Sequence, residues 1–172
     1  MGRDSSSMET TPTSELTMKT SKSQSYAELM EQAASYVAEV QPLLVNPVDV
    51  ANIMRPLICS KPQEELWVLC MNTKHRLIKM EMVCRGAIDR CTVDKPAIFR
   101  HAILAGASSF ILVHNHPSGD TMPSNADSVL TKEIDRAAEF MGIRMLDHII
   151  VSVKTTENTA GYFSFRDSGL LR

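Results

Sequence analysis

Residues 108–116 constrain the fold of this chain more than any other segment, because an apolar run ends there in two histidines. Residues 108–113 predict a buried strand, and successive side chains of a strand point to opposite faces. His114 and His116 therefore share one face, while Asn115 turns to the other. The sequence Pro-Ser-Gly-Asp at 117–120 then predicts a tight turn that folds the chain back toward the strand end.

A helix is expected after this turn. Apolar residues recur at helical spacing over residues 124–142, and Gly142 ends the pattern. Ser124 and Asp127 match a capping box, which alone explains either residue. Because the turn returns the helix start to the strand end, Asp127 is also placed to meet His114 and His116. Two imidazoles and one carboxylate suit Zn²⁺ with a fourth position open for water, as in a catalytic zinc site.

Helix and strand signals alternate along the rest of the chain. Helical spacing predicts helices over residues 26–40 and 48–54, limited by Pro42 and Pro56. A hairpin is expected at residues 66–83, a helix at 96–106 and a strand at 143–153. Residues 162–165 either add a short strand or simply cover the sheet. This succession predicts a single α/β (α+β) domain, with a mixed sheet flanked by helices.

The inward faces of two helices follow from the same spacing. We expect the helix at 96–106 to bury Ile98, Ala102, Ile103 and Ala105. The helix at 124–142 should bury Leu130, Ile134, Ala137, Ala138 and Met141.

Composition narrows the class of protein. The chain has 172 residues, 44% of them hydrophobic, enough for one domain with a core. A net charge of −2 predicts no broad nucleic-acid footprint. No apolar run approaches the roughly 18 residues of a membrane span. Four cysteines without a CxxC pair or signal peptide indicate reduced, mostly buried thiols in a cytoplasmic protein: Cys59, Cys70, Cys84 and Cys91.

The chain divides into three predicted parts. Residues 1–25 are rich in Ser and Thr and predict a disordered tail. Residues 26–62 predict a helical lead-in, which could be a lid or a partner surface, although packing on the domain behind it is favoured. Residues 63–172 carry the strands and the histidines and predict the functional domain.

The site residues carry a family resemblance. The JAMM (MPN+) metalloprotease signature is matched without a gap by His114-x-His116, Ser124 and Asp127, with seven residues between His116 and Ser124 and two between Ser124 and Asp127. The string HNHPSG at 114–119, the segment LDHIIV at 146–151 and the closing GYFSF at 161–165 resemble the RadC-type branch of that family. The similarity runs from about residue 63 to residue 171 and implies a JAB/MPN-like, cytidine deaminase-like domain.

The resemblance also implies a mechanism, which is metal-assisted hydrolysis of a peptide or protein substrate. Zn²⁺ held by His114, His116 and Asp127 would activate a water. The family requires an upstream glutamate as general base, and the stretch EELWVL at 64–69 maps this role onto Glu64, with Glu65 as the adjacent alternative. Ser124 would donate to the developing oxyanion.

Two departures from the RadC pattern bear on function. Members of that branch often carry an N-terminal helix-hairpin-helix domain, and residues before 63 contain no Gly-rich hairpin, which weakens a DNA-binding interpretation. Residues 92–97 also lack the family's usual Pro-Arg-Glu run. The alternatives to a peptidase are a RadC-type binding module in DNA repair or recombination and a metal-dependent hydrolase of nucleic acid. Oligomeric state has no signal in the sequence.

Asp147 and His148 are conspicuous polar residues in the predicted strand at 143–153. They are candidate neighbours of the site. The interpretation that we favour is a hydrogen-bonded pair at a strand end.

Overall fold

The computed structural model describes residues 25–86, 93–156 and 158–171, and these form a five-stranded sheet in the order β2-β1-β3-β4-β5. Strands β3 and β4 are parallel, while the other neighbouring strands pair antiparallel. The predicted mixed sheet is therefore confirmed. The strands are β1 (Glu65–Met71), β2 (Leu77–Arg85), β3 (Ser109–Asn115), β4 (Arg144–Val151) and β5 (Tyr162–Ser164).

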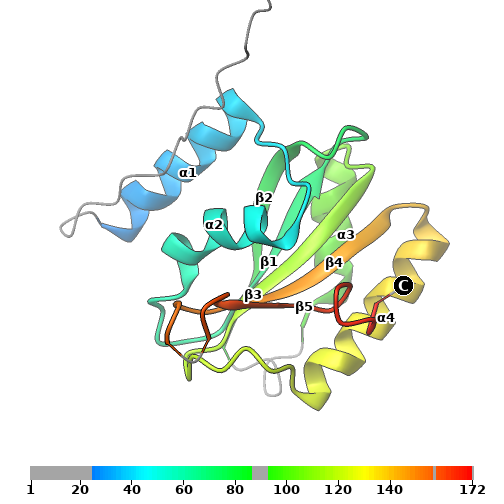
Figure 1. Ribbon diagram of the computed structural model, residues 1–172. Coiled ribbons are helices and arrows are strands. Elements are labelled where there is room, and N and C mark those ends of the chain that lie inside the picture. Colours follow the sequence, from blue (N-terminus) through cyan, green and yellow to red (C-terminus); the bar gives the residue numbers. More distant parts are fainter. Residues whose placement is uncertain (1–24, 87–92, 157, 172) are drawn as a thin grey trace, which may run out of the picture.

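Helices cover both faces of the sheet, as Figure 1 shows. Helices α1 (Tyr26–Val40) and α2 (Pro47–Ile58) lie on one face, and α3 (Lys95–Leu104) and α4 (Asn125–Met141) lie on the other. Each face has its own buried apolar cluster, because alternate residues of a central strand point to opposite sides. In β1, for example, Trp67 and Leu69 pack toward α2, while Leu66 and Val68 pack toward α3 and α4.

Helix α4 begins and ends as its sequence predicts. The Ser124 hydroxyl accepts a hydrogen bond from the Asp127 N–H, and the Asp127 carboxylate accepts one from the Ser124 N–H. This reciprocal capping box satisfies backbone donors that a helix start leaves unpaired. At the other end Gly142 adopts φ 68°, a left-handed conformation that glycine tolerates best.

Helix α2 corrects one predicted boundary. Pro56 does not close it, since the helix continues to Ile58. A proline inside a helix costs about 3 kcal/mol through its missing N–H and its ring. Leu57 and Ile58 are both fully buried, however, and burying one such side chain gains about 1.5–3 kcal/mol. The burial of these two residues offsets the cost of the proline.

The helices on the α4 side correct two predicted core residues. Ile103 and Met141 are 53% and 45% exposed, although we expected both to face inward. With Phe140, which is 93% exposed, they line an apolar surface groove between α3 and α4. The apolar stripe on each helix is therefore wider than the face that the sheet covers.

The lead-in packs on the sheet, in agreement with the favoured interpretation. Five residues of α2 are buried, and all five belong to the same apolar cluster as Trp67: Val50, Ala51, Met54, Leu57 and Ile58. Residues 1–24 of the predicted tail and Cys91 lie outside the described residues. The division of the chain at residue 63 stays a prediction.

Candidate metal centre

Three predicted ligands come together where β3 ends against the first turn of α4. His114 lies in β3, His116 directly follows that strand, and Asp127 lies in α4. One potential ligand atom from each lies within 4.8 Å of the other two. The His114 Nε2 atom is 3.3 Å from Asp127 Oδ1, and the His116 Nε2 atom is 3.6 Å from Asp127 Oδ2.

The Asp127 carboxylate is held by the start of its own helix. Its Oδ2 atom accepts hydrogen bonds from the Ser124 hydroxyl at 2.6 Å and the Ser124 N–H at 2.8 Å. The side chain is only 2% exposed. Capping and convergence on the histidines therefore coexist, and Ser124 orients the carboxylate.

The tautomer of His116 follows from its outer partner. Its Nδ1 atom lies 2.7 Å from the Asp120 carbonyl oxygen, which can only accept a hydrogen bond. Nδ1 therefore carries a proton and donates it. In the neutral ring, Nε2 then presents a lone pair toward His114 and Asp127.

The tautomer of His114 follows from a longer chain of hydrogen bonds. The Thr131 hydroxyl donates to the Asp127 carbonyl at 2.6 Å, so it accepts from His148 Nδ1, also at 2.6 Å. Burial, the largest influence on His148, lowers its pKa to about 4, so the ring is neutral at pH 7 and its Nε2 can only accept. His114 Nδ1 lies 2.8 Å from that atom and must donate to it. The His114 Nε2 lone pair therefore also faces the centre.

Both tautomers point to a cation site. The two Nε2 atoms are 3.0 Å apart, a distance that suits a hydrogen bond, but neither neutral ring has a proton left to place between them. Two lone pairs and a carboxylate converging in a buried site repel one another unless a positive charge lies among them. The donor set, two imidazole nitrogens and one carboxylate, is one that binds zinc and related transition metals. The residues present therefore fit a metal ion.

The electrostatics of the centre favour positive charge beside Asp127, which a bound cation supplies and which a proton on His116 supplies in its absence. Burial opposes a charge on His116, but the Asp127 carboxylate, the Asp120 carbonyl and the charge of Glu64 outweigh it and raise its pKa. Burial likewise opposes the charge of Asp127, yet the two histidines and Ser124 hold the pKa of that carboxyl well below its usual range. The surroundings thus favour an anionic Asp127 with positive charge beside it.

The two candidate glutamates point to opposite faces. Leu66 pairs with His114 and packs on the α4 side, so Glu64, two residues earlier, shares that face. Its charge acts on His116. Glu65 is buried and its carboxylate accepts from Trp67 Nε1 at 3.1 Å and Arg85 Nε at 3.0 Å. The geometry favours Glu64 over Glu65 as the residue that faces the metal centre.

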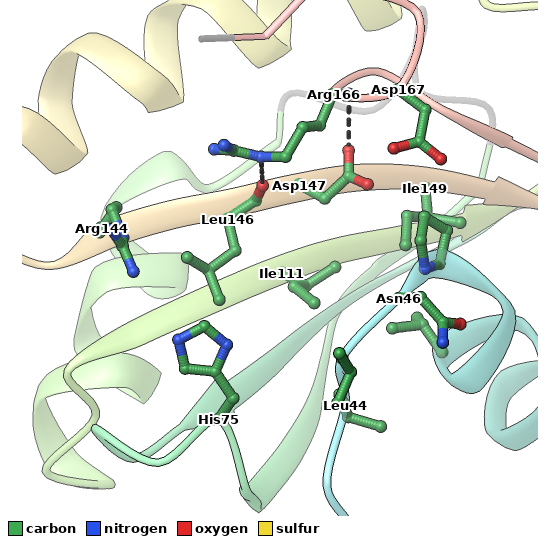
Figure 2. A pocket seen from close by; sticks show the side chains of 13 residues that line it. Leu44, Asn46, His75, Ile111, Arg144, Leu146, Asp147, Ile149, Arg166 and Asp167 are labelled. Atoms are coloured by element: carbon green, nitrogen blue, oxygen red, sulfur yellow. Dashed lines mark hydrogen bonds between the residues drawn. The ribbon is translucent and has the colours of Figure 1, made fainter.

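The expectation for His148 is wrong, because this ring lies within β4, is fully buried and bonds to His114. Asp147 lies on the other face of β4. There it accepts from the Ser164 hydroxyl at 2.5 Å and the Arg166 N–H at 3.0 Å, beside a cavity of about 240 Å³ (Figure 2). Only His148 of this pair belongs to the candidate centre.

Two partners of the ligands, Thr131 and the Asp120 carbonyl, were not predicted, and a third, His148, was a candidate neighbour that was not the favoured interpretation. Thr131 lies one helical turn after Asp127, a spacing that could have identified it. His148 carries no local signal, since its place beside His114 depends on the parallel register in which Leu112 pairs with His148. The Asp120 carbonyl belongs to the backbone, which no residue type reveals.

Fold and site together define an α+β domain with a candidate metal centre at the end of a central strand. Residues 44–170 match the model of the RadC-like JAB domain, and the chain belongs to that family. The matched region includes α2.

Individual proteins are also similar to this chain. A UPF0758 protein of Chlorobium chlorochromatii is 45% identical over 123 residues, covering 72% of this chain and 53% of the relative. One of Finegoldia magna is 45% identical over 109 residues, with shares of 63% and 49%. One of Methanosarcina barkeri is 32% identical over 145 residues, with shares of 84% and 61%. The chain thus spans about half the length of the curated relatives that it matches. None of the helices in the described part of the chain could cross a membrane.

Proposed function

We propose that this chain is a zinc-dependent hydrolase that cleaves peptide or isopeptide bonds. The observation that carries the proposal is the convergence of two imidazole lone pairs and the Asp127 carboxylate on the strand face that Glu64 shares. His114, His116 and Asp127 would hold the metal. When bound, Zn²⁺ would supply Lewis acidity that activates a water and polarises the substrate carbonyl.

Glu64 has the chemistry of a general base in this arrangement. Its carboxylate would accept the proton of the attacking water and deliver it to the nitrogen of the leaving amine. A partly exposed position at the entrance of β1 suits this role, because the carboxylate needs access to both water and substrate. Glu65 lacks such access, since it is buried among its own donors.

Ser124 has two roles in the proposal. In this structure its hydroxyl donates to Asp127 and so orients a ligand. To stabilise an oxyanion, the hydroxyl would exchange this acceptor for the substrate oxygen. Its exposed position at the start of α4 leaves room for that rotation. We also propose a cytoplasmic location, since the described cysteines Cys59, Cys70 and Cys84 are all free thiols.

Cleavage by the zinc-loaded protein tests the proposal. The protein is incubated with a mixture of peptides and lysine-linked isopeptides, and mass spectrometry identifies new amino termini and released lysine amines. Glu64→Gln should lower the rate by about 10²–10⁴-fold without loss of zinc. Glu81→Gln removes another half-buried carboxylate, on β2, and is the matched control that should keep the rate.

Two results would contradict parts of the proposal. Absence of any zinc-dependent cleavage by the wild-type protein would overturn the hydrolase assignment. A full rate in Glu64→Gln beside a large loss in Glu65→Gln would move the base to Glu65.

A further inference from the structure

Asn115 stands between the two histidine ligands and points away from them. It is fully buried, and it lies at the end of β3. Its Oδ1 atom accepts a hydrogen bond from the Glu65 N–H at 2.8 Å, and its Nδ2 group donates to the Gln63 carbonyl at 3.2 Å. One side-chain amide therefore binds the backbone on both sides of Glu64.

This contact replaces main-chain pairing at the point where pairing stops. The antiparallel register of β1 and β3 runs from Met71 opposite Ser109 to Leu66 opposite His114 and goes no further. Glu65 would face Asn115 in the next pair. The side chain of Asn115 thus holds the entrance of β1 where the ladder between β1 and β3 has ended.

The carboxylate of Glu65 adds a second constraint on the same backbone. It is held on the α2 side of the sheet by the Trp67 indole and the Arg85 guanidinium. Since neighbouring side chains of a strand point to opposite faces, a fixed Glu65 directs Glu64 toward the metal centre. Asn115 and Glu65 therefore restrain one short segment from two directions.

We infer that Asn115 is a positioning residue, which holds residues 63–65 so that the Glu64 carboxylate faces the metal centre. The inference rests on the proposed function, because it assigns Asn115 a task for the proposed base. It also gives a reason for asparagine at this position. The amide supplies one acceptor and one donor at a fixed spacing, whereas an aspartate would lack the donor for Gln63 and an alanine would lack both.

The test measures the position of Glu64 directly, without relying on activity. Co²⁺ replaces the metal, and paramagnetic effects on the NMR signals of the Glu64 side chain report its distance from the ion. Amide hydrogen exchange of Glu65 reports the hydrogen bond to Asn115. The variants are Asn115→Ala and Asn115→Asp, and the matched control is Asn72→Ala. Asn72 also binds backbone N–H groups, but at the distant hairpin turn.

The expected results separate these variants. Asn115→Ala should speed exchange of the Glu65 amide by about tenfold or more, while the Val68 amide in the centre of β1 stays protected. The cobalt-induced effects on Glu64 should weaken or scatter. Asn115→Asp should fall between Asn115→Ala and the wild type, because it keeps the acceptor. Asn72→Ala should match the wild type at both residues.

Where cleavage is detected, kinetics give a second readout. Asn115→Ala should lower kcat by about tenfold or more, with KM and metal content unchanged, and should have no further effect in a Glu64→Gln background. Unchanged cobalt effects on Glu64 in Asn115→Ala would overturn the inference. Loss of folding or metal in both Asn115 variants, but not in Asn72→Ala, would show a general structural role and overturn it as well. Altered cobalt effects without cleavage by any form would support the positioning role and count only against the proposed function.

Discussion

Two buried carboxylates on opposite faces of the sheet show how the metal centre differs from ordinary polar structure. Glu65, 1% exposed on the α2 side, accepts from the N–H groups of Trp67 and Arg85. Asp127, 1% exposed on the α4 side, accepts from Ser124 but also faces two imidazole lone pairs. The first carboxylate is matched by the donors of its own neighbours, while the second lies among imidazole nitrogens that have no proton to offer it when both rings are neutral. Of these two carboxylates, Asp127 is therefore the one placed to share a metal ion.

The largest expected effect is a loss of stability on the α2 side of the sheet that leaves the metal centre intact. Leu57 is fully buried there, so Leu57→Ala should lower the free energy of unfolding by about 2–5 kcal/mol. Urea denaturation measures the loss. Metal content of the folded variant should stay at the wild-type level, because Leu57 lies on the other face from the ligands. A fall in metal content per folded chain would show that the two faces are not independent.

Removal of a metal ion bound on the α4 side should lower the thermal stability of the folded protein. A ligand present at a hundredfold its Kd stabilises the folded state by about 2.7 kcal/mol. Excess chelator should therefore lower the Tm of the wild-type protein by several degrees, roughly 2–4 °C for each kcal/mol. His116→Ala, which lacks a ligand, should show the same Tm with and without chelator. Equal shifts in both proteins would contradict the assignment of the site.

Thr131 tests the outer part of the metal centre. Thr131→Val removes the hydroxyl that accepts from His148, leaving a buried N–H unpaired at a cost of about 1–3 kcal/mol. A less restrained His148 should also weaken metal binding by about 10–100-fold. Competition with a chromophoric chelator measures this affinity. Thr131→Ser keeps the hydroxyl and should bind the metal with the wild-type affinity. An affinity of Thr131→Val equal to that of the wild type would show that Thr131 does not support the metal centre.

The smallest expected effect is the slow chemical labelling of two cysteine thiols in the apolar clusters on the two faces of the sheet. Burial raises the pKa of Cys59 and of Cys70 to about 11. Both should therefore resist iodoacetamide at pH 8 in the folded protein and react after unfolding, as peptide mass spectrometry would record. Because the folded pKa values are raised, their stabilising contribution is complete below about pH 9 and is lost as the pH rises toward 11. Rapid labelling of the folded protein at pH 8 would contradict this view of the two clusters.

Much of the fold followed from residue patterns. Helical spacing, apolar runs and turn residues predicted the described helices and the strands β1 to β4, while β5 was one of two interpretations of residues 162–165. The capping residues Ser124 and Gly142 marked α4 correctly. The misjudged features depend on tertiary packing. Pro56 stays inside α2 because its neighbours are buried, and Ile103 is exposed because α3 meets the sheet along a narrower face than its apolar stripe.

In the candidate site, too, the residues placed by local structure were predicted, and those placed by tertiary contacts were harder to predict. His114, His116 and Asp127 were found because a strand, a turn and a capped helix place them locally. His148 was a candidate neighbour of the site that was not favoured, because only the pairing of two distant strands brings it to His114. The family resemblance placed the base at Glu64 with Glu65 as the alternative, but spacing alone could not choose between them, since a register shift of one residue would exchange their faces.

The metal content of the purified protein tests the central claim most directly. Elemental analysis should find one zinc per chain in the wild type and in Glu64→Gln, and none in His116→Ala, with folding of each checked by circular dichroism. A full complement of zinc in folded His116→Ala would contradict the account.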